Sequence, residues 1–351
     1  MVSTLDDVKR NAIAVKLADL KLIQQLIIEN EQLFLRESTD SEISDRFRKM
    51  LEDDQKNLGV LETTIVQYGV HGEPKSTVRQ LVDQVRKLMQ GSELTFFEKV
   101  FQHELLKHQQ VMSGLIEHKA AQKVGADVMA AIGPLNTINF ENRAHQEQLK
   151  GILEVLGVRE LTGQDVDQGI WARVQDAIAA FSGVVGSAVT QTSDKQDMNI
   201  QDVIRMDHNK VNVLFTEILQ SNDPQKIQEY FGQLYKDLTA HAGAEEEVVY
   251  PRVRSFYGER DTQELYDEQA DMKRRLDTIR GTNPSAAEFK DQIRQLMDIV
   301  MDHVRQEENT MFAAIRNNLS SQQTEQLATE FKAAKSRIQE RMGSSRSGAN
   351  V

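Results

Sequence analysis

The stretch "LTAHAGAEEEVVYP", residues 238–251, has the period of an α-helix but carries two polar residues on its apolar face. Spacings of 4, 3, 4 and 3 residues place on one side of that helix Leu234, Leu238, His241, Glu245 and Val248. Burying an imidazole and a carboxylate among leucines costs several kcal/mol unless something pairs with them. The sequence therefore predicts a polar partner or a ligand inside this part of the fold.

Other helices predicted in the second half of the chain repeat this arrangement. His208 lies in an apolar row of the helix expected near 199–220. In the helix expected near 287–317, His303 and Glu307 repeat the spacing of the pair described above. Gln269 takes the corresponding inward position in the helix expected near 261–281. Every histidine of this half is therefore predicted to face one bundle core.

Convergence of imidazoles and carboxylates favours a metal site over the ordinary alternative. A single inward histidine is most often a hydrogen-bonded core residue. Several of them, with two carboxylates one helical turn away, match the ligands of iron, manganese or zinc and offer no soft donor for copper(I). The predicted metal ligands are His208, His241, Glu245, His303 and Glu307.

These residues carry a resemblance to a known family. The region 200–317, with "DHNKV", "HAGAEEEVVYP" and "HVRQEENTMF", resembles the hemerythrin-like, or HHE cation-binding, domain. The resemblance implies two irons bridged by two glutamates and completed by histidines. In "DEQADM", Gln269 stands where the family has a histidine, which leaves one metal a ligand short. Glu268 or water can take that place, or only one metal binds tightly.

The first half contains a second candidate metal site. Helices are predicted near 5–36, 40–69, 93–126 and 134–157, with a short helix at 76–90 in a long connection like that of ferritin-like folds. Inward carboxylates and histidines on these helices resemble the di-metal carboxylate pattern. A structural hydrogen-bonded layer is the alternative, and His103 and His118 are expected at the surface or edge. The candidate ligands are Glu31, Asp54, Glu104, His108, Glu141 and His145.

The predicted architecture is all-α, with two tandem four-helix bundles joined by a connecting helix. A chain of 351 residues is long enough for about two domains. We expect a ferritin-like bundle at 1–160, a connecting helix and linker at 161–198, a hemerythrin-like metal-binding bundle at 199–320, and a helix end with a disordered tail at 321–351.

Composition limits the partners and the location. The absence of cysteine excludes disulfides and thiolate ligands. A net charge of −12 argues against nucleic acid, because phosphate binding needs a basic face. No apolar run is long enough to cross a bilayer and the N-terminus lacks a signal-peptide pattern, so we expect a cytoplasmic protein without a membrane partner.

The expected function is that of a non-haem iron protein. A di-iron centre, with manganese or zinc as alternatives, would react with or sense O2, peroxide or NO in oxidative stress or iron homeostasis. One alternative is a ferroxidase or peroxide-scavenging enzyme that uses the second site. Another is a helical interaction protein whose metal is structural or lost. Enzymatic activity and oligomeric state, a homodimer included, are left open.

Overall fold

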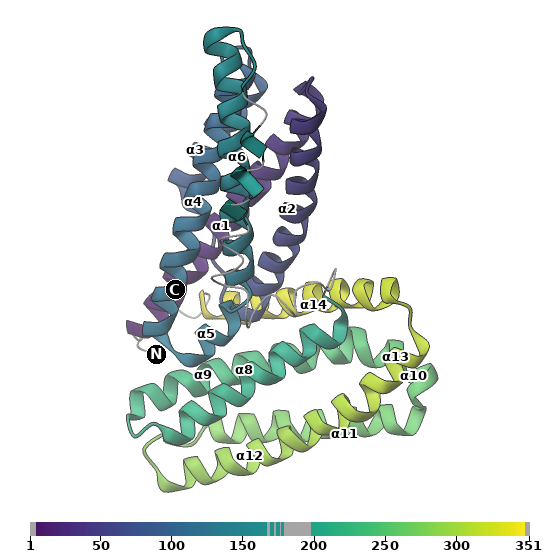
Figure 1. Ribbon diagram of the computed structural model, residues 1–351. Helices are drawn as coiled ribbons and strands as arrows, with labels where there is room; N and C mark the ends of the chain where they lie inside the picture. Colours follow the sequence, from purple (N-terminus) through teal and green to yellow (C-terminus); the bar gives the residue numbers. More distant parts are fainter. Residues whose placement is uncertain (1–4, 167–168, 172, 176, 179–197, 348–351) are drawn as a thin grey trace.

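The computed structural model describes residues 5–166, 169–171, 173–175, 177–178 and 198–347. These residues form helices joined by short loops and contain no strand, which confirms the all-α prediction. Two bundles are visible in Figure 1, one rising from a face of the other. Among the described helices, none combines the length and the apolar character that crossing a membrane requires.

The N-terminal bundle is built from four long helices. These are α1 (Leu5–Glu37), α2 (Ser41–Tyr68), α4 (Phe96–Val124) and α6 (Leu135–Thr162), with α3 (Ser76–Gln90) in the connection before α4 and α5 (Ala126–Ile132) after it. Two caps fix the starts of α2 and α4. The Asp40 side chain accepts from two backbone amides of α2, and Thr95 forms a capping box with Glu98.

The C-terminal bundle contains two helices that change their winding partway. It consists of α8 (Ile200–Gln220), α9 (Pro224–Ala244) with η2 (Glu245–Val249) and α10 (Tyr250–Tyr257), α11 (Glu259–Arg280), and α12 (Ala287–Gln306) with η3 (Glu307–Met311) and α13 (Phe312–Asn318). Pro251 does not end this helix, which continues to Tyr257. A proline removes one i→i−4 hydrogen bond, and the π-helical turn η2 lies directly before it.

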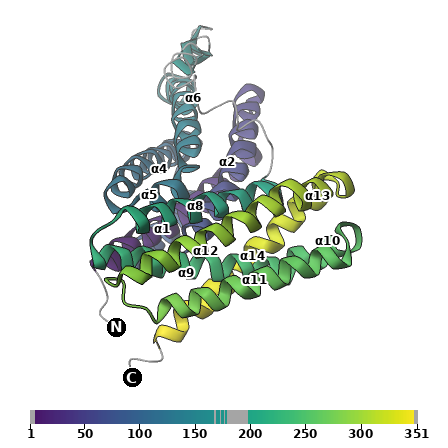
Figure 2. The ribbon, with the colours of Figure 1, turned by 90° about the horizontal axis from the view of Figure 1, so that it is seen from below.

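Helix α14 (Ser321–Ser347) differs from the predicted helix end and disordered tail. It packs against α8, α9, η2 and α2, so it lies between the two bundles (Figures 1 and 2). The prediction followed the polar composition of the tail and missed an apolar face with the period of a helix. Its buried residues are Leu327, Ala328, Phe331 and Ala334.

Buried polar contacts join the two bundles. Lys210 on α8 donates to the carbonyls of Gln67 (2.7 Å) and Tyr68 (2.9 Å) at the end of α2 and pairs with Asp237 at 2.9 Å. Gly69 ends α2 with a φ of 76°, and a Cβ there would lie 2.6 Å from Asp237 Oδ1. Both the positive φ and the short distance to Asp237 therefore require glycine at position 69.

The predicted connecting helix and linker at 161–198 fall mostly outside the described residues. Trp171 is described, and its ring lies 3.8 Å from the Arg46 guanidinium on α2. It also covers Gly151 on α6, where a Cβ would meet the indole at 3.1 Å. Trp171 therefore packs against the N-terminal bundle.

Candidate metal centre

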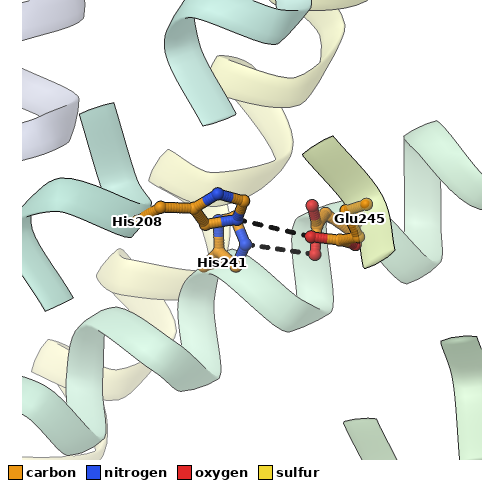
Figure 3. Close-up of side chains that lie close together, drawn as sticks. His208, His241 and Glu245 are labelled. Carbon is orange, nitrogen blue, oxygen red and sulfur yellow. Dashed lines mark ion pairs between the residues drawn. The ribbon is translucent and has the colours of Figure 1, made fainter. Parts of the chain in front are cut away.

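The structure brings the predicted ligands of the C-terminal half together from five helical segments. His208 comes from α8, His241 from the end of α9 and His303 from α12, while Glu245 and Glu307 are the first residues of η2 and η3. All five are buried. One ligand atom each of His208, His241, Glu245 and Glu307 lies within 4.8 Å of all the others. Figure 3 shows the imidazoles of His208 and His241 on the side that faces the Glu245 carboxylate.

Each histidine contacts a carboxylate through its Nε2 atom. His241 Nε2 lies 3.1 Å from Glu245 Oε2, and His208 Nε2 lies 3.3 Å from Glu307 Oε2. His303 Nε2 lies 3.3 Å from the other oxygen of Glu307, Oε1. We call these five residues the His/Glu cluster. It lies between two apolar cores, one on each side along the bundle.

The two glutamates share a feature of backbone geometry. Glu245 begins η2 and Glu307 begins η3, so each is followed by a π-helical turn. Within η3, the Thr310 hydroxyl donates to the Gln306 carbonyl at 2.6 Å. π-turns inside α-helices occur frequently at functional sites because they re-aim side chains. The two matching turns set the directions of the side chains that follow the glutamates.

A second set of carboxylates holds the outer nitrogen of each histidine. Nδ1 of each ring faces an acid outside the cluster, so a neutral ring that keeps its proton on Nδ1 would direct the Nε2 lone pair inward. The pairs are His208 with Glu308 (2.8 Å), His241 with Asp207 (3.0 Å) and His303 with Glu268 (2.5 Å). Glu268, predicted as a substitute ligand, here contacts the outer side of His303.

The acids around the cluster favour positive charge. Burial alone lowers the pKa of His241, but Glu245 and Asp207 outweigh it and raise the value to about 10. For His303, Glu307 and Glu268 outweigh burial in the same way and raise the pKa to about 10. The surroundings thus stabilise a cation at this place, whether a proton or a metal ion.

Unsatisfied polar atoms test whether a metal ion fits. Buried polar atoms nearly always have a hydrogen-bond partner. In the cluster and at the adjacent Gln269, four buried atoms make no hydrogen bond. Two are Glu245 Oε1 and Gln269 Oε1, and the other two are His208 Nε2 and Glu307 Oε2, which form only the 3.3 Å ion pair described above. Neutral imidazole and carboxylate donors suit iron, manganese or zinc. The residues present therefore fit a metal ion.

Gln269 and a tyrosine complete the wall of the cluster. The Gln269 amide donates to Glu245 Oε2 at 2.7 Å and to the Tyr250 hydroxyl at 2.5 Å. The sequence placed Gln269 correctly on the inward face but did not single out Tyr250. Residues five apart on a regular α-helix point about 140° away from each other. Only the π-turn brings Tyr250 round to the side of Glu245.

The N-terminal bundle gathers half of its predicted ligands around a lysine. Lys107 Nζ donates to Asp54 Oδ2 and lies 3.0 Å from His145 Nδ1 and 3.8 Å from Glu31 Oε1. It also donates to Asn142 Oδ1 at 3.2 Å. The ammonium group is thus a cation already present where these side chains meet. Sequence reasoning missed Lys107.

Two of the other three candidates, Glu104 and His108, lie apart because the inward face of α4 differs from the predicted one. His108 is exposed and Glu104 half-buried, and both accept from Gln146 instead. The inward face carries Lys107 and His103, which is fully buried and not at the surface. Apolar side chains on the outer face of α4 explain the error, namely Phe101, Leu105, Met112 and Ile116, which are 44–58% exposed. Glu141 is half-buried on α6. A metal site in this bundle stays a prediction.

Comparison with known proteins agrees with the C-terminal assignment. Residues 199–315 match the hemerythrin HHE cation binding domain, so the fold and the cluster define a bundle of that class. The whole chain is 80% identical, over 351 residues and the full length of both proteins, to a DNA nickase of Nostoc sp. (strain PCC 7120), and it belongs to the same family. An uncharacterized hemerythrin-like protein of Schizosaccharomyces pombe is 24% identical over 139 residues, which is 39% of this chain and 68% of that protein. No solved structure matches the chain.

Proposed function

We propose that this chain is a metal-dependent DNA nickase, with iron bound at the His/Glu cluster. The observation that carries the DNA part is the 80% identity with a DNA nickase over the full length of both proteins. The cluster and the match to a cation-binding domain support the metal part. Nicking cuts one strand of a duplex, and by hydrolysis it adds one water across one P–O bond and leaves a phosphate end and a hydroxyl end.

The residues of the cluster would divide the work of holding the metal. His208, His241 and His303 would bind through Nε2 once a metal ion replaces the proton there, and the two glutamates would bind through carboxylate oxygens. The outer acids fix the imidazole orientations, as such partners do in metal sites. The apolar cores on both sides keep bulk water out. A bound metal ion supplies Lewis acidity and, in the case of iron, redox chemistry.

The burial of the cluster supports a second candidate function at the same metal. The five ligands are at most 6% exposed, so a phosphodiester of duplex DNA does not reach them in this arrangement. A mainly apolar cavity lies beside them, lined by the three histidines, Gln269 and side chains such as Leu238, Met272 and Val300. Such a cavity suits O2, peroxide or NO. Reaction with or sensing of such a molecule, in oxidative stress or iron homeostasis, is the second candidate.

Conversion of supercoiled plasmid to open circles tests the nicking proposal. Iron-loaded wild-type protein should nick, and chelation of the metal should stop it. His208→Gln should lose nicking, whereas the matched control His118→Gln, on the partly exposed side of α4, should retain it. Absence of nicking by the loaded wild type refutes the DNA proposal. Equal nicking by His208→Gln refutes a role for the cluster.

The chemistry of the nicked ends separates the two routes. DNA ligase reseals a hydrolytic nick with a 5′-phosphate and a 3′-hydroxyl, but not one made by oxidation of a sugar. Given the burial of the cluster, we expect the oxidative route, with peroxide as the oxidant of the sugar. Ligase should not close such nicks, and catalase should suppress them. The expectation of no nucleic-acid partner, drawn from the net charge, stays a prediction, and the same assay tests it.

A further inference from the structure

Tyr250 has more polar neighbours than its hydroxyl group needs. It is the first residue of α10 and has no exposed surface. A tyrosine hydroxyl has one proton to donate and a small capacity to accept. This one donates to Glu307 Oε1 at 2.8 Å and accepts from Gln269 at 2.5 Å. It also lies 3.3 Å from His303 Nε2 and 3.4 Å from Glu245 Oε2.

The two oxygens of Glu307 divide the cluster into two ends. Oε2 faces His208 at 3.3 Å. Oε1 faces His303 at 3.3 Å and the Tyr250 hydroxyl at 2.8 Å. One end thus offers the imidazoles of His208 and His241. The other end offers His303 and a phenol oxygen, with Gln269 beside them.

We propose that Tyr250 is a metal ligand at the His303 end of the cluster. It supplies there the donor that is lost because Gln269 occupies the position of a histidine. This proposal rests on the metal binding proposed above and extends it to a second donor type. On binding, the O–H bond breaks, the proton leaves to solvent, and the oxygen forms a bond to the metal. A hard, anionic oxygen donor favours ferric iron over softer ions.

A purely structural tyrosine makes a different spectroscopic prediction. If the hydroxyl only orients Glu307 and Gln269, bound ferric iron has no phenolate ligand. A phenolate bound to ferric iron produces a charge-transfer band in the visible region, and excitation in that band enhances the ring vibrations of tyrosine. Histidine and carboxylate ligands do not produce the enhanced tyrosine vibrations.

The test uses the full chain loaded with ferrous iron and then oxidised. The wild type should show the visible band and the enhanced tyrosine vibrations. Tyr250→Phe should lose both while circular dichroism stays helical. Tyr266→Phe is the matched control, because its ring packs on Tyr250 with centroids 5.0 Å apart but its hydroxyl donates to the Glu246 carbonyl. This control should keep the band.

Each other outcome overturns a definite part of the account. Tyrosine vibrations that persist in Tyr250→Phe refute the Tyr250 assignment. Wild-type protein that binds iron without tyrosine vibrations refutes it as well, even where the variant fails to fold. Wild-type protein that binds no iron refutes the metal binding on which the assignment rests.

Discussion

Replacing Lys107 with methionine should destabilise the N-terminal bundle through Asp54. The ammonium group is fully buried and hydrogen-bonded to that carboxylate. Burial alone raises the pKa of Asp54, but Lys107 and then His145 outweigh it and hold the pKa well below its usual value. Methionine has a similar length, so Lys107→Met removes the charge with little change in packing volume.

The expected cost follows from the titration of Asp54. Without the ammonium, this buried carboxylate takes up a proton on folding. Protonating a group with an ordinary pKa of 3.8 at pH 7 costs about 4 kcal/mol, at about 1.4 kcal/mol per pH unit. This loss of stability agrees with the roughly 3–5 kcal/mol that removing one partner of a buried ion pair typically costs. Since the folded-state pKa is raised in the variant, the lost stability should return as the pH falls toward about 4.

Urea unfolding followed by Trp171 fluorescence measures this effect. Trp171 is the only tryptophan and contacts Arg46 and Gly151 of the same bundle. Lys150→Met is the control, since Lys150 is 59% exposed and its pair with Glu147 should contribute less than about 1 kcal/mol. A Lys107→Met protein as stable as this control at pH 7 refutes the reasoning. Manganese or zinc should stabilise the variant more than the wild type if the side chains left there can bind metal.

Three further changes test other parts of the structure. Burial raises the pKa of Glu117 to about 8, so the contribution of this residue to stability falls as the pH rises from about 4.5. Glu117→Gln should therefore stabilise the fold by up to about 3 kcal/mol at pH 7 but little at pH 4. Thermal unfolding at both pH values measures this, and equal shifts at the two pH values would contradict it. Lys335 on α14 pairs with Asp207, and Asp207 in turn contacts His241. Lys335→Met should therefore weaken iron binding about 10- to 100-fold in a chelator competition. Unchanged iron affinity would count against this role of the pair. Gln269→His should raise metal occupancy in equilibrium dialysis, and no change argues against its alignment with the family histidine.

The inward positions of the histidines in the His/Glu cluster were predictable because their helices have one apolar face each. On α8 and α12, His208 and His303 interrupt rows of buried aliphatic residues, so spacing alone fixed their direction. Tyr250 was not predictable in this way. Its position depends on a π-turn, and a regular helical period points it elsewhere.

The N-terminal bundle shows where periodicity fails. Helix α4 has apolar residues on both its buried and its exposed sides, so the pattern did not select the face that carries Lys107 and His103. A lysine is also seldom expected in a core, although here Asp54 offsets its charge. For α14, the polar composition of the tail predicted disorder, whereas contacts with both bundles stabilise a helix there.

The central claim is that the His/Glu cluster binds a metal ion, and a metal count on the purified full chain tests it most directly. After loading with ferrous iron and desalting, the wild type should retain iron in stoichiometric amount by inductively coupled plasma mass spectrometry. The double variant His241→Ala/Glu245→Ala should lose that iron while keeping a helical circular dichroism spectrum. Equal iron in the wild type and the double variant, or none in the wild type, would contradict the account.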